Sequence, residues 1–188
     1  MGISITGSGA IFGVLAAIIV IIDAVLLERP LLVVDADRRY IAVQSKTHAD
    51  HYIITGRRND HFVARLWQDA FAITTLVPIK KAAKQNADVL CDDDGCVVAA
   101  RSNVIVALPN TLEAMRQDCK RADIVIFPEW GVPDGWCEDS DEEIKLIDRW
   151  DIADHGTIAI IKNSAEGFSL IGGHNSNTPW AVTYGRSQ

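Results

Sequence analysis

The N-terminal segment constrains most strongly how this chain can fold. From Gly2 to Ile22 the sequence contains no charged residue, and the run from Ala10 to Ile22 is almost wholly apolar. The apolar character resumes after Asp23 and continues to Leu27. A helix that crosses a membrane needs roughly 20 predominantly apolar residues, and this stretch meets that length. We therefore predict a transmembrane anchor within residues 1–30 and one soluble domain over residues 31–188.

Two other interpretations of the N-terminal segment remain open but fit it less well. A cleaved signal peptide usually carries a basic n-region, whereas no Lys or Arg precedes Arg29. A buried core helix would be weakened in water by Gly2, Gly7, Gly9 and Gly13. Because the anchor has almost no basic flank, the positive-inside rule does not determine its orientation.

The composition favours a packed domain with an acidic surface. Hydrophobic residues make up 48% of the chain and charged residues 23%, which is enough apolar material for a core. The formal net charge of −7 argues against broad, charge-driven binding of nucleic acid. Two basic groups are more typical of solvated faces than of DNA sites: Arg57, Arg58 and Arg65, and Lys80, Lys81 and Lys84.

The soluble part alternates short strands with short helices. Apolar runs between turn signals predict strands at 31–35, 40–43, 52–55, 104–108, 122–127, 144–147, 157–162 and 168–171, and a hairpin over 89–100. Helical spacing predicts helices near 60–71 and 111–120. Only residues 104–127 form a strand–helix–strand unit, and residues 129–143 are predicted to be a long surface loop. The pattern predicts an α+β or layered α/β domain with a mixed, β-rich sheet.

The four cysteines are the first candidates for a chemical role. They allow three disulfide pairings, and we favour Cys91 with Cys96 across the hairpin and Cys119 with Cys137. Disulfides require an oxidising compartment such as the periplasm, which a membrane anchor makes reachable. A zinc site is disfavoured because the second pair is too widely spaced for a knuckle. Four reduced, buried thiols are the remaining alternative.

A short tract before the third strand resembles part of a metal-binding motif. Metallo-β-lactamase-type sites use H-x-H-x-D-H after a strand, and His48, Asp50 and His51 match the last three ligands. Imidazole and carboxylate ligands suit zinc or manganese. However, Lys46 stands where the first His belongs, and an ammonium group does not coordinate a cation. The favoured interpretation is a polar turn, with no catalytic residue and no cofactor assigned.

The order of these features resembles the C-terminal region of ComEC-type competence proteins of the alphaproteobacterial kind. The similarity covers nearly the whole chain. Its most specific pieces are the CD-x-x-GC hairpin, the DC-x-x-AD-x-V step and the final Pro-Trp. The segments that carry it, in chain order, are Leu31–Asp35, Tyr40–Val43, Phe62, Arg65–Trp67, Cys91–Cys96, Asp118–Cys119, Ala122–Ile126, Cys137, Leu146–Arg149, Gly156 and Thr178–Trp180.

The resemblance implies a role in DNA uptake. ComEC proteins are polytopic inner-membrane proteins thought to pass transforming DNA as a single strand. Many carry a C-terminal metallo-β-lactamase-like domain, proposed to degrade the other strand. In this chain Glu129-Trp-Gly131 stands where active relatives have metal-binding histidines, so the resemblance implies a degenerate form of that domain.

Three functional hypotheses follow from the sequence. The favoured one is a noncatalytic, membrane-tethered accessory domain of a ComEC-type channel, on the periplasmic side of the inner membrane. Its partners would be the membrane, a polytopic channel subunit or the remainder of the same protein, and single-stranded DNA; no small-molecule substrate is evident. The second is a metal-dependent nuclease or hydrolase that uses His48, Asp50 and His51. The third is a generic structural or interaction domain.

Overall fold

The structure is a computed structural model that describes residues 29–56, 61–85, 88–129, 131–132, 136–137, 145–163 and 167–173. The predicted anchor, which ends before Arg29, lies outside these residues, and so does the C-terminal Pro-Trp of the resemblance. Within the described part, none of the helices combines the length and the apolar character that crossing a membrane demands.

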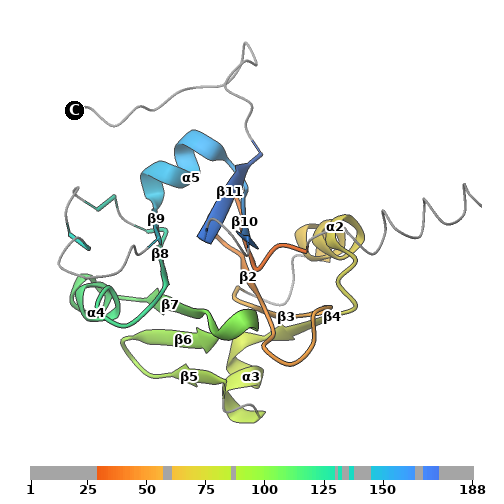
Figure 1. The fold of residues 1–188 in the computed structure, drawn as a ribbon, viewed down its shortest axis with the longest axis horizontal. Coiled ribbons are helices and arrows are strands. Elements are labelled where there is room, and N and C mark those ends of the chain that lie inside the picture. The colour runs from red at the N-terminus through yellow and green to blue at the C-terminus, as the bar shows by residue number, and fades with distance from the viewer. Residues whose placement is uncertain are drawn as a thin grey trace, which may run out of the picture.

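Two mixed β-sheets pack face to face in the described part of the chain (Figure 1). Sheet 1 has six strands in the order β11-β10-β1-β2-β3-β4. Its strands are β1 (Leu32–Val34), β2 (Ile41–Gln44), β3 (His51–Ile54), β4 (Thr75–Pro78), β10 (Ile158–Asn163) and β11 (Gly167–Gly172). β1, β2 and β3 form an antiparallel meander, and β4 is parallel to β3.

Sheet 2 has five strands in the order β5-β6-β7-β8-β9. They are β5 (Val89–Cys91), β6 (Gly95–Ala99), β7 (Ile105–Pro109), β8 (Ile124–Phe127) and β9 (Lys145–Asp148). The β5–β6–β7 part is antiparallel, whereas β7, β8 and β9 run parallel to one another. A single-turn 3₁₀ helix, η1 (Arg101–Asn103), joins β6 to β7.

Four α-helices surround the described sheets. α2 (His61–Phe71) covers the outer face of sheet 1, and α4 (Leu112–Asp118) covers part of the outer face of sheet 2. Figure 1 shows these two helices on opposite sides of the sandwich. α3 (Ile79–Gln85) and α5 (Arg149–His155) each place an apolar side chain, Ala82 and Ile152, in the central core. The layered α/β architecture predicted from the sequence is present at this level of detail.

The core has one cluster between the sheets and one under each outer helix. In β1, Leu32 and Val34 face the opposite sheet, and Val33 faces α2. In β8, Ile124 and Ile126 face inward, and Val125 faces α4. Both faces of these strands are therefore buried, which is why they read as continuous apolar runs rather than as alternating ones.

The structure corrects three expectations about the fold. The strands form two sheets instead of one. Residues 104–127 are not alone in forming a parallel strand–helix–strand unit, because β3, α2 and β4 form another. The predicted surface loop over 129–143 is buried in part, since Val132 is 3% exposed in the cluster under α4. Turn residues indicate where strands end, but they do not indicate which strands will pair.

Candidate functional site

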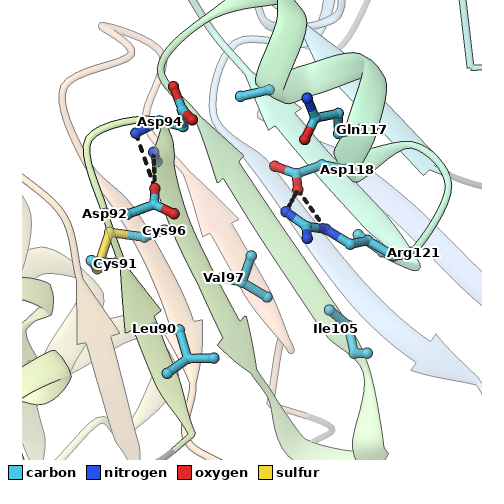
Figure 2. A pocket seen from close by; sticks show the side chains of 13 residues that line it. Leu90, Cys91, Asp92, Asp94, Cys96, Val97, Ile105, Gln117, Asp118 and Arg121 are labelled. Atoms are coloured by element: carbon cyan, nitrogen blue, oxygen red, sulfur yellow. Dashed lines mark hydrogen bonds and ion pairs between the residues drawn. A yellow bond between two sulfur atoms is a disulfide. The ribbon is translucent and has the colours of Figure 1, made fainter.

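A groove lies on the outer face of sheet 2, between the β5–β6 hairpin and α4 (Figure 2). It has a volume of about 480 Å³. The hairpin forms one wall, the last turn of α4 and the residues after it form the other, and apolar side chains of the sheet form the floor. It brings together segments that are far apart in the sequence.

The hairpin wall is held by a disulfide and an aspartate turn. Cys91 and Cys96 are directly opposite each other in the register of β5 and β6 and are bonded to each other. The Asp92 Oδ1 atom accepts the N–H groups of Asp94 and Gly95, both at 3.0 Å. A side chain at Gly95 would meet the Leu108 carbonyl oxygen at 2.5 Å, so this close approach requires glycine.

The helix wall contains a buried carboxylate paired with an exposed guanidinium. Thr111 caps the start of α4 by accepting the Ala114 N–H at 3.1 Å, which fixes where the helix begins. Asp118 is only 4% exposed, and its Oδ1 accepts Arg121 Nη2 at 2.6 Å and Nε at 3.0 Å. This ion pair places the Arg121 guanidinium, with its several N–H donors, at the rim of the groove. It also gives the buried Asp118 carboxylate its hydrogen-bond donors.

The floor of the groove is apolar because α4 covers only part of sheet 2. Across the outer face, Leu90, Val97, Ala107, Val125 and Leu146 are partners in register from β5 to β9. The buried cluster under α4 contains Ala107 and Val125, and the partly buried Val97 and Leu146 pack against it. Leu90 remains 69% exposed, so the β5 end of this row faces solvent.

The second disulfide joins the end of α4 to the loop after β8. Cys119 is bonded to Cys137, and Met115 Sδ lies 3.4 Å from Cys119 Sγ. The Arg116 guanidinium stacks over the Trp136 ring at 4.2 Å from its centroid. The structure therefore contains both disulfides that the sequence analysis favours, and they fix the two walls of the groove independently.

The tract with His48, Asp50 and His51 lies on sheet 1, not in the groove. The His48 and His51 ring centroids are 4.6 Å apart, and Asp50 Oδ1 is 4.0 Å from His51 Nε2. Asp50 Oδ2 accepts the Thr74 hydroxyl at 2.7 Å, and this hydrogen bond lowers the pKa of the carboxyl below its usual value. The turn before β3 is closed by the His51 N–H, which donates to the His48 carbonyl.

These three side chains do not converge as metal ligands would. In the part of the chain that the structure describes, no three His, Cys, Asp or Glu groups are gathered so that they could hold a metal ion. The structure places His48 and Asp50 in the turn that precedes β3, and His51 at the first position of that strand.

The sequence analysis missed the residues that shape the groove. It identified the cysteines and the hairpin, but not Leu90, Arg121 or Ile105. Ile105 lies at one end of the floor and is 37% exposed. A single exposed Leu in a short strand carries no pattern that distinguishes it from a core residue. Only the pairing of β5 at the edge of sheet 2, outside the cover of α4, exposes it.

The lining of the groove combines an apolar floor with three carboxylates and one guanidinium. Comparisons with protein-family models, curated protein sequences and solved structures find no match to this chain.

Proposed function

We propose that the chain is a noncatalytic, membrane-tethered accessory domain of a ComEC-type channel for the uptake of transforming DNA. One observation carries the proposal. The two most specific pieces of the resemblance within the described residues, Cys91–Cys96 and Asp118–Val125, contribute the two walls of a single groove. Motifs that converge on one surface point to a shared binding role better than motifs that are scattered over the molecule.

The remaining features support this proposal without identifying the partner. A layered α/β domain with mixed sheets is what a degenerate metallo-β-lactamase-like domain would provide. Two disulfides are typical of an oxidising, extracytoplasmic compartment, which supports a location on the periplasmic side of the inner membrane. The tether is the apolar segment that ends at Leu27.

The groove would bind a protein segment of the channel rather than DNA. Asp92, Asp93 and Asp94 are exposed at the hairpin turn, and their charges repel phosphate. An apolar side chain of the partner would cover Leu90 and Val97, and a polar group would meet Arg121. The partner is a polytopic channel subunit or the remainder of the same protein, and single-stranded DNA is the cargo of the assembly.

The direct test measures transformation frequency in a competent host whose own copy carries Leu90→Asp. A charge at the β5 end of the apolar floor is expected to lower DNA uptake by about tenfold, which corresponds to a loss of about 1.4 kcal/mol of binding. Ile171→Asp is the matched control, because Ile171 is 52% exposed on the edge strand β11 of the other sheet. Equal uptake in both variants and the unsubstituted host would contradict the proposal.

A second experiment separates the accessory role from nuclease activity. Metal content and cleavage of single- and double-stranded DNA are measured on the purified chain in Mn²⁺ or Zn²⁺. We expect neither bound metal nor cleavage, because Asp50 is engaged with Thr74 and no ligand cluster surrounds it among the described residues. Stoichiometric metal, with cleavage abolished by His51→Ala, would replace this proposal by a nuclease.

A further inference from the structure

Helix α2 leaves two large apolar side chains exposed to solvent. Its inner face packs on sheet 1 through Trp67, which is 4% exposed, whereas Phe62 is 75% and Leu66 is 53% exposed. Phe62 and Leu66 are four residues apart, so they lie next to each other on one side of the helix. The exposed residues Arg65 and Asp69 flank them. We call these four residues the α2 ridge.

The described chain begins on the same outer face of sheet 1. The Tyr52 hydroxyl donates a hydrogen bond to the Pro30 carbonyl. The Tyr52 side chain belongs to the cluster that α2 covers, together with Trp67. A single layer of side chains therefore links the entry point of the chain to the helix that carries the ridge.

The length of the connection limits how far this face can lie from the membrane. The apolar segment ends at Leu27 and β1 begins at Leu32, and the five residue steps between them span at most about 18 Å. This step rests on the membrane tether of the proposed function. If the segment that ends at Leu27 is in the bilayer, this length keeps the start of β1 near the lipid headgroups, within reach of the outer face of sheet 1.

We propose that the α2 ridge docks onto the phospholipid surface of the same membrane. Phe62 and Leu66 enter the boundary between headgroups and acyl chains, as the apolar face of an interfacial helix does. Arg65 can pair with a lipid phosphate, and the nearby carboxylate of Asp69 keeps the net charge of the ridge near zero. Apolar burial therefore drives the contact, and its dependence on salt is weak.

Tethering makes so small a contact sufficient. Two apolar side chains on a helix of 11 residues would bind a membrane only weakly as a free peptide. A short connection turns docking into an intramolecular event with a high effective concentration.

Docking also has a consequence for the groove. Figure 1 shows α2 and α4 on opposite sides of the sandwich, where they cover its two outer faces. Docking through α2 therefore turns the groove beside α4 away from the membrane.

The experiment uses the full chain reconstituted into phosphatidylcholine–phosphatidylglycerol vesicles that contain a brominated phosphatidylcholine. Phe62→Trp and Leu66→Trp introduce reporters on the ridge. Leu90→Trp is the control, because Leu90 is 69% exposed but lies on the opposite sheet. The fluorescence that each variant adds to the unsubstituted chain is measured with and without brominated lipid. We expect the ridge signals to fall at least about twofold and the Leu90→Trp signal to stay unchanged.

An alkaline wash of the same vesicles separates the two parts of the argument. If the chain stays in the washed vesicles but neither ridge reporter is quenched more than Leu90→Trp, docking is wrong and the tether stands. If the wash releases the chain, the tether fails and docking fails with it. Equal quenching of all three reporters also contradicts docking, because it shows that no particular face meets the lipid.

Discussion

At the scale of single residues, Asp148 organises more backbone than any other carboxylate described above. It is fully buried, and its Oδ1 accepts the N–H groups of Trp150 at 2.7 Å and Asp151 at 3.1 Å. Its Oδ2 accepts the Val132 N–H at 2.9 Å, and the Asp148 N–H in turn donates to Asp151 Oδ2 at 3.0 Å. One side chain therefore caps α5 and anchors the chain that follows β8.

Replacing Asp148 by alanine should remove both functions. We expect Asp148→Ala to lower the free energy of unfolding by about 3 kcal/mol, because a helix cap is lost and a buried N–H is left without its partner. Asp148→Asn keeps one acceptor oxygen and should cost less than half as much. Urea denaturation of the purified chain measures both values. A loss below about 0.5 kcal/mol in the alanine variant would mean that water replaces the carboxylate.

At the scale of elements, the two disulfides constrain segments of different length. Cys91 and Cys96 are separated by 5 residues within one hairpin, whereas Cys119 and Cys137 are separated by 18 and join α4 to the loop after β8. The ladder between β5 and β6 already holds the hairpin together. The longer loop has less regular structure of its own, so its cross-link removes more freedom from the unfolded chain.

Removing each disulfide should therefore have unequal effects. By loop-closure entropy, the Cys119→Ser/Cys137→Ser variant is expected to lose about 3 kcal/mol and the Cys91→Ser/Cys96→Ser variant about 2 kcal/mol. Denaturation of the two variants under oxidising conditions measures the difference between their free energies of unfolding. Adding reductant to the unsubstituted chain breaks both disulfides and should lower its free energy of unfolding by both losses together. The opposite order of the two variants would indicate that the hairpin, not the loop, depends on its cross-link.

At the scale of the whole molecule, the sandwich closes through strands from distant parts of the sequence. β1 lies between β2 and β10, and Leu32 of β1 is opposite Ile160 of β10. Both side chains are fully buried in the cluster that both sheets share. Sheet 1 is therefore incomplete until β10 is present, and we expect the described domain to unfold as one unit.

A cavity at this junction tests that cooperativity. Ile160→Ala should lower the free energy of unfolding by about 3 kcal/mol, because it removes buried methyl groups at the contact between the sheets. Ile171→Ala, on the neighbouring strand but 52% exposed, should change it by less than about 0.5 kcal/mol. Tryptophan fluorescence and far-ultraviolet circular dichroism should report the same urea midpoint. Separate midpoints would mean that the two sheets unfold independently.

The sequence predicted the elements well because their signals are local. The hairpin over 89–100 is marked by Asp94-Gly95 and by a cysteine on each strand, and the helix after Thr111 is marked by its cap. Each of these depends on contacts between residues only a few positions apart.

Tertiary structure alone decided how these elements are combined. The sequence could not indicate that the strands divide into two sheets, that β9 pairs with β8, or that Val132 is buried beside α4. Nor could the sequence indicate that Cys91–Cys96 and Asp118–Arg121 line the same groove. Strand pairing and the packing of helices on sheets depend on side chains that are distant in the sequence, and a local periodicity contains no information about such distances.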